Sequence, residues 1–165
     1  MLWFGWFGFN GGSALSPNAI ASVAFINTSI SASAAMVVWM LISWMHKGKP
    51  SIIGALTGAI AGLIAITPAA GFVTPGAATL FGLLAGAICY GAVVFKESRG
   101  WDDALDVWAV HGVGGILGSI LTGIFASPET GAFERSGRRD SKMHWQLQRR
   151  QRQGLCCEGN GQREE

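Results

Sequence analysis

Charged side chains are scarce in this chain: 13% of its 165 residues are Asp, Glu, Lys or Arg, while half are hydrophobic. About a quarter of the residues of an ordinary water-soluble domain are charged, so this composition excludes that class. Cysteine is scarce too: Cys89 lies in an apolar stretch, and Cys156 and Cys157 are adjacent. This spacing excludes a disulfide framework and a cysteine-based metal site, and we expect neither a metal nor a cofactor.

The few charges are divided unevenly along the chain. Eight of the 12 basic residues and six of the 10 acidic residues lie after Ser127. The net charge of +2 is therefore a sum over two unlike regions and is not a signature of nucleic-acid binding. We expect a membrane domain over residues 1–127 and a separate tail over residues 128–165.

Long segments that are almost free of charge and rich in Gly, Ala and Ser fill the first region. They are Ala19 to Met45, Ser51 to Ile66, Gly76 to Phe95 and Val107 to Ala126. Crossing the hydrocarbon core takes about 20 apolar residues, so these four segments predict transmembrane helices. The opening segment, Met1 to Gly12, is too short to cross alone and lacks the basic start and cleavage site of a signal peptide. The sequence thus predicts an all-α, polytopic membrane helix bundle with an incomplete first helix and four full spans.

Glycines recur four residues apart within these segments. The pairs are Gly54 and Gly58, Gly58 and Gly62, Gly82 and Gly86, and Gly114 and Gly118. In lipid, small residues at this spacing let helix backbones approach closely. We interpret the pairs as packing seams.

The basic residues of the membrane region predict its orientation. Lys47 and Lys49 follow one span and Lys96 and Arg99 follow the next but one, so both pairs lie on one face. Short loops that carry Lys and Arg stay on the cytoplasmic side, and the loops without them therefore lie outside. The tail contradicts this pattern, because it would begin outside and is basic. We interpret it as disordered. The acidic residues at its end argue against the alternative, a nucleic-acid-binding arm.

His111 is the strongest candidate for chemistry, because an ionisable group inside a span is costly and is usually functional. The alternative is a structural histidine that forms a hydrogen bond between helices, and residue type alone does not separate the two. Asp103 and Asp106 precede the same span, where the more ordinary interpretation is helix capping. No nucleophile, metal pair or second acid matches the depth of His111, so we do not expect an enzyme.

A second candidate cluster lies at the outer end of the first segment, with Trp6, Phe7, Phe9, Asn10 and Ser13. Aromatic residues at a membrane interface are usually anchors. The other interpretation is that an aromatic face and a hydroxyl attract a small cation. Polar residues of the next span, such as Asn27 and Thr28, are more simply explained as interhelical hydrogen bonds.

Six ordered motifs resemble the ammonium transporter, methylammonium permease and Rhesus family. They are Gly5-Trp-Phe-Gly-Phe-Asn-Gly-Gly-Ser13, Ala24-Phe-Ile-Asn-Thr28, Gly48-Lys-Pro-Ser-Ile-Ile-Gly-Ala55, Gly58-Ala-Ile-Ala-Gly-Leu63, Ile66-Thr-Pro-Ala-Ala70, and Asp106 through Gly123 with Val110-His-Gly-Val-Gly-Gly115. The likeness runs from Leu2 to about Ser127. It implies the second, His-bearing five-helix repeat of a fold made of two inverted repeats, assembled as a homotrimer with one pore per subunit.

The resemblance also implies roles for individual residues. His111 matches the second of two pore histidines, Phe9 matches a gating phenyl ring, and Ser13 matches the hydroxyl of an outer ammonium site. Leu2, Trp6 and Val107 match positions that line the pore. The expected solute is ammonium, ammonia or methylammonium, crossing a plasma or inner membrane. No nucleic acid is expected as a partner.

The first repeat and its partner histidine have no counterpart in this sequence. We therefore interpret the chain as a truncated or frame-shifted product that is inactive alone, unless another chain supplies the missing repeat. The alternative is a non-conducting membrane fragment that associates with full-length homologues.

Overall fold

The computed structural model describes residues 1–127 and residue 130, and its helices belong to one compact unit, Met1–Gly131. The unit contains α1 (Leu2–Gly12), α2 (Ala19–Lys47), α3 (Ile52–Ile66), α4 (Pro75–Ser98), the π-helix η1 (Trp108–Val113) and α5 (Gly114–Phe125). The part of the chain that the structure describes contains no strand, so the all-α prediction is confirmed. The disordered-tail prediction concerns residues that lie outside the described ones.

Three of the helices are long and apolar enough to cross a membrane: Ala19–Lys47, Pro75–Ser98 and Trp108–Phe125. The fourth predicted span, α3, has 15 residues and is shorter than the others. At about 1.5 Å per residue, it falls short of the roughly 30 Å hydrocarbon core. Pro68 follows its last turn, and a proline cannot continue the backbone hydrogen-bond ladder.

The starts of three helices follow from the residue that precedes each of them. The side chains of Asn18, Ser51 and Thr74 accept hydrogen bonds from the backbone N–H groups of Ala21, Gly54 and Ala77. Each bond satisfies a donor that has no partner within its own helix. At the other end of α2, Gly48 adopts a left-handed backbone with φ +72°, which stops the helix at Lys47.

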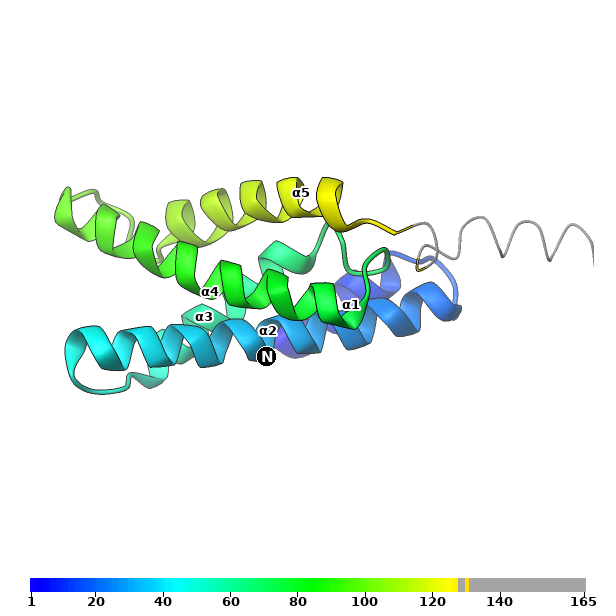
Figure 1. The fold of residues 1–165 in the computed structure, drawn as a ribbon, viewed down its shortest axis with the longest axis horizontal. Helices are drawn as coiled ribbons and strands as arrows, with labels where there is room; N and C mark the ends of the chain where they lie inside the picture. Colours follow the sequence, from blue (N-terminus) through cyan, green and yellow to red (C-terminus); the bar gives the residue numbers. More distant parts are fainter. Residues whose placement is uncertain (128–129, 131–165) are drawn as a thin grey trace, which may run out of the picture. The chain divides into compact units, whose positions relative to one another are not determined.

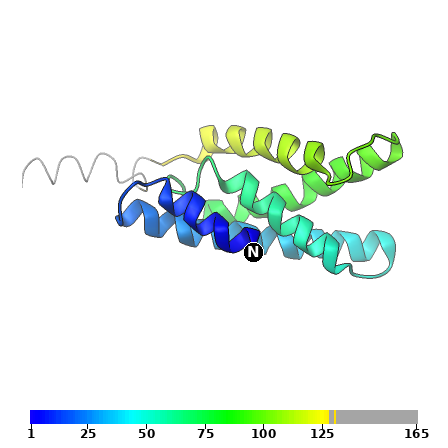
Figure 2. The ribbon, with the colours of Figure 1, turned by 180° about the vertical axis from the view of Figure 1, so that it is seen from behind.

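Helix α2 is the centre of the bundle, because α1, α3 and α4 all contact it (Figure 1). Seen from behind, α1 and α3 lie on the near side with α2 and α4 behind them, and α5 runs along the upper edge (Figure 2). Two buried apolar clusters fill the interior. One gathers around Phe81, Ile66 and Val73, and the other gathers around Trp39, Tyr90 and Val110.

The glycine pairs lie at helix contacts, as the spacing predicts. A Cβ on Gly62 of α3 would lie 2.5 Å from the carbonyl oxygen of Ser31 on α2, and one on Gly86 of α4 would lie 2.7 Å from that of Ala35. On α5, a Cβ on Gly118 would clash with the backbone of Ala65 on α3. Each of these glycines is therefore required because another backbone lies against it.

Buried polar side chains join the same helices. The amide of Asn27 donates to the carbonyl oxygens of Ala70 and Val73, each at 2.8 Å, and the hydroxyl of Ser31 donates to that of Gly62. Asn10 donates to the hydroxyl of Thr28 at 2.9 Å. Thr28 and Ser31 therefore bond α2 to α1 and α3, as the sequence predicted for its polar residues, whereas Asn27 binds the connection between α3 and α4.

Candidate functional site

His111 lies on η1, a six-residue π-helical stretch within the last long apolar helix. A π-helical turn contains one more residue than an α-helical turn, so it changes the direction of the side chains that follow. Such turns are rare in proteins, and those that occur are often found at functional sites. The side chain of His111 is exposed, and within the described part of the chain its ring makes no hydrogen bond. If His111 were a structural histidine, its ring would form a hydrogen bond to another helix. No described residue forms such a bond with it.

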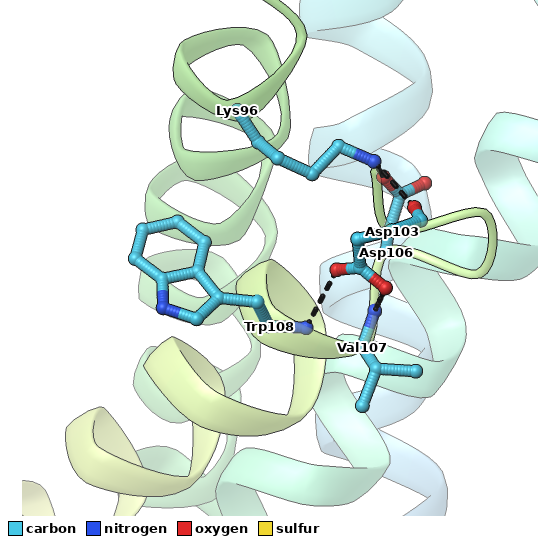
Figure 3. A network of polar contacts seen from close by, with 5 residues as sticks. All are labelled: Lys96, Asp103, Asp106, Val107 and Trp108. Atoms are coloured by element: carbon cyan, nitrogen blue, oxygen red, sulfur yellow. Dashed lines mark hydrogen bonds and ion pairs between the residues drawn. The ribbon is translucent and has the colours of Figure 1, made fainter. Parts of the chain in front are cut away.

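The start of this helix is held by Asp103. Its carboxylate accepts hydrogen bonds from the backbone N–H groups of Val107 at 3.0 Å and Trp108 at 2.8 Å (Figure 3). An anionic group at this end of a helix also interacts favourably with the helix dipole. Val107, the residue before η1, has a side chain that is 47% exposed.

Asp106 has a different partner. Its carboxylate forms an ion pair with the ammonium group of Lys96, at 2.6 Å, and the same ammonium donates to the backbone carbonyl of Asp103 (Figure 3). Lys96 lies near the end of α4 and is buried. Asp106 therefore joins α4 to the segment before η1, a contact that sequence reasoning did not anticipate.

Three of the other candidate residues lie together on α1. Leu2, Trp6 and Phe9, with Met1 and Gly5, line an open apolar groove of about 440 Å³. The rings of Trp6 and Phe9 meet edge to face, with centroids 6.0 Å apart. The groove therefore has an aromatic wall and almost no polar surface.

Trp6 is tied to the rest of the bundle. Its ring N–H donates to the hydroxyl of Thr67, at the end of α3, at 2.9 Å. The indole also packs against the buried cluster that contains Val110, the residue before His111. Thus Trp6 ties the groove on α1 to the end of α3 and to the buried cluster beneath it. The sequence did not predict that Thr67 is the hydrogen-bond partner of Trp6, because the two residues lie 61 positions apart in the chain.

Ser13 and Phe7 lie outside this arrangement. The hydroxyl of Ser13 donates to the carbonyl of Phe9 at 2.6 Å, at the end of α1. The ring of Phe7 stacks on that of Phe25, with centroids 4.0 Å apart. The structure thus separates the predicted aromatic cluster into a groove-lining pair, Trp6 and Phe9, and a packing residue, Phe7.

No three His, Cys, Asp or Glu side chains among residues 1–127 and 130 come together in a way that could hold a metal ion. The roles in transport that the resemblance implies for His111 and for the residues of α1 concern a passing solute, and they stay predictions.

Comparison with known proteins identifies relatives over most of the chain. Residues 1–156 match the model of the Ammonium Transporter Family. This range passes the predicted boundary at Ser127. The ammonium transporter Amt1 of Archaeoglobus fulgidus is 53% identical over 133 residues, which are 81% of this chain and 34% of that protein. An ammonium transporter of Bacillus subtilis is 52% identical over 128 residues, 77% of this chain and 32% of its own length.

Solved structures agree with the sequence matches. The crystal structure of Candida albicans Mep2 has a TM-score of 0.77 and 44% identity, covering 81% of this chain and 30% of Mep2. Saccharomyces cerevisiae Mep2 has a TM-score of 0.76 and 45% identity, covering 79% of this chain and 29% of its own. The chain thus spans about a third of the length of the relatives it matches.

Proposed function

This chain belongs to the ammonium transporter family, and we propose that it forms one wall of a path for ammonium or ammonia across a membrane. Its apolar helices and its relatives make it a multi-pass membrane protein. Within the family fold, we assign it to the second, His-bearing repeat. The six motifs that it shares with the family in order support this assignment.

The observation that carries the proposal is an imidazole, His111, exposed on a rare π-helical turn of an apolar span. Moving an ammonium ion through hydrocarbon is costly, whereas moving ammonia is not. An imidazole can donate to or accept from ammonia and can carry a proton at neutral pH. His111 would therefore bind the solute in the dry part of the path, where few other polar groups compete.

The groove on α1 suits the outer part of the same path. Phe9 and Trp6 offer aromatic surface, which attracts cations through the ring quadrupole, and Leu2 keeps the wall apolar. Ser13, one turn beyond Phe9, would offer its hydroxyl to an arriving ammonium ion. Val107 would line the inner part of the path on the same helix as His111.

The apolar side chains left exposed support the presence of a second wall. Leu2 and Phe9 are 63% and 61% exposed on α1, and Ile116, Ile120 and Ile124 form an exposed row on α5. A five-helix repeat that packs against an inverted copy would cover such surfaces. We assign the opposite wall to the other repeat, in a homotrimer of pore-forming subunits or in a complex with full-length homologues.

Uptake of radiolabelled methylammonium tests the proposal. We expect none in cells that express this chain alone. Uptake should appear when the cells also express a relative's polypeptide from which the segment matching this chain has been removed. In that pair, His111→Ala should lower the uptake rate by about tenfold, the effect of losing roughly 1.4 kcal/mol of interaction with the passing solute.

The matched control is Ser119→Ala. The hydroxyl of Ser119 donates to the carbonyl of Gly115 in the preceding turn of α5, so its loss leaves the path unchanged. Equal uptake by the His111→Ala variant and the wild type would contradict the proposed role of the histidine.

The exposed apolar face also fits a second function, in which the chain joins full-length homologues without conducting. Co-purification of the tagged chain with a full-length relative, together with reduced uptake by that relative, would favour this function. Unaffected uptake would count against it.

A further inference from the structure

Lys96 lies in the last turn of α4, and only 7% of the residue's surface is exposed. Lysine is rarely this buried unless its charge is paired. Its two acceptors come from one short turn: the carbonyl of Asp103 and the carboxylate of Asp106, both at 2.6 Å. One cation of α4 therefore binds both ends of the turn that precedes η1 (Figure 3).

The backbone of this turn is strained at Asp106. Its φ of +54° lies in the left-handed region, which residues other than glycine seldom adopt and which Asp and Asn tolerate best. The carbonyl of Asp106 accepts from the N–H of Val110 at 2.8 Å, an α-type bond that joins Asp106 to the first turn of η1. The conformation of Asp106 thus sets where the helix that carries His111 begins.

Two further contacts hold the same segment. The carboxylate of Asp103 binds the N–H groups of Val107 and Trp108. The ring of Trp101 meets those of Phe95 on α4 and Trp108 on η1 edge to face, at 5.9 and 5.1 Å. The aromatic contacts are apolar and less directional, whereas the Lys96 bonds fix two particular oxygens.

We propose that Lys96, through its ion pair with Asp106, is a positioning residue that sets the register of η1 against α4 and therefore the placement of His111. This inference rests on the function proposed above, because it treats His111 as the group that meets the solute. An exposed ion pair would contribute little and would leave the helix unaffected by its loss. The burial of Lys96 and its two acceptors on one turn distinguish it from such a pair.

A measurement on His111 itself tests the inference without requiring transport. The full chain in membranes is treated with diethyl pyrocarbonate, and mass spectrometry gives the modification rate of His111 relative to that of His46 on α2. We expect Lys96→Met and Asp106→Asn each to change this ratio by about threefold or more. Asn tolerates the backbone at position 106, so the second variant removes the charge without adding backbone strain.

Three comparisons sharpen the test. The double variant should match either single variant, because both remove the same ion pair. Lys96→Arg, which keeps the charge, should stay close to the wild-type ratio. Lys49→Met removes an exposed lysine that follows α2 and should leave the ratio unchanged.

An unchanged ratio in both Lys96→Met and Asp106→Asn, with normal amounts in the membrane, would overturn the inference. So would failure of both variants to accumulate while Lys49→Met accumulates, because Lys96 would then be a folding anchor. The two proposals can also fail separately. If the Lys96 and Asp106 variants change the modification ratio of His111 but the chain supports no uptake in the paired assay, Lys96 is a positioning residue and the proposed transport function is wrong.

Discussion

The indole N–H of Trp6 donates a 2.9 Å hydrogen bond to the hydroxyl of Thr67, a residue 61 positions later in the chain. The hydroxyl of Thr67 in turn donates to the carbonyl of Leu63 at 2.7 Å. Because its own hydrogen is used in that bond, the Thr67 oxygen acts only as an acceptor for the indole N–H. The end of α3 therefore orients an aromatic side chain that lines the groove on α1.

Thr67→Val keeps the shape of the side chain and removes the acceptor, so the Trp6 N–H loses its partner. We expect a loss of stability of about 1 kcal/mol, measured by thermal unfolding in detergent. Thr57→Val is the matched control, because the hydroxyl of Thr57 donates only within its own helix, to the carbonyl of Ile53. Equal losses in both variants would show that the bond to Trp6 contributes nothing.

Asn27 is fully buried and holds the segment after α3 through the carbonyl oxygens of Ala70 and Val73. Asn27→Asp keeps its size but replaces the donating amide with an oxygen that repels both carbonyls. We expect a loss of about 3 kcal/mol or more, because buried acceptors are left unpaired beside a charge. Thermal unfolding measures the loss.

Asn18→Asp provides the control for this substitution. Asn18 caps α2 with its side-chain oxygen, and Asp caps a helix about equally well, so this variant should unfold like the wild type. Similar stability of the two variants would mean that the amide of Asn27 does not hold the segment.

Gly62→Ala tests the glycine seam between α2 and α3. The added Cβ would lie 2.5 Å from the carbonyl oxygen of Ser31, and a backbone atom cannot move aside without shifting the helix. We expect a loss of about 1–3 kcal/mol from overpacking. Gly91→Ala on α4 is the control, since nothing lies within 4 Å of its added Cβ. A stable Gly62→Ala variant would contradict the tight contact.

The predicted orientation is tested by cysteine labelling in a background without the three native cysteines. Ser13→Cys should react with a membrane-impermeant maleimide in intact cells, because Ser13 is exposed and follows α1 on the predicted outer face. Lys49→Cys should react only after the membrane is opened. The reverse labelling pattern would place the basic loops outside.

Much of the fold could be predicted because it depends on neighbouring residues. Asn18, Ser51 and Thr74 begin their helices through hydrogen bonds to the N–H three residues on. Gly48 ends α2 through its left-handed backbone, and Pro68 has no N–H with which to extend α3. The glycine pairs predicted that helices touch. They did not predict which ones, and the structure pairs Gly62 and Gly86 with α2 and Gly118 with α3.

The candidate site was predictable in part. The cost of an imidazole in an apolar span marked His111, and the resemblance marked Leu2, Trp6, Phe9, Ser13 and Val107. The π-helical form of η1 was not predictable, because residues 108–113 show no pattern that separates a π-turn from an α-turn. The pairing of Asp106 with Lys96 was missed for a related reason: an acid just before a helix usually caps it, and here Asp103 does so instead.

The amino-acid sequence by itself determined that this chain is helical and belongs in a membrane, because hydropathy and local capping act over a few turns. It also predicted that His111 lies within an apolar span. Only the tertiary structure decided that Lys96 reaches Asp106, that Thr67 orients Trp6 and that His111 is left exposed. Those outcomes depend on how separate helices meet in space, and hydrogen bonds between them form only where packing brings the partners within about 3 Å.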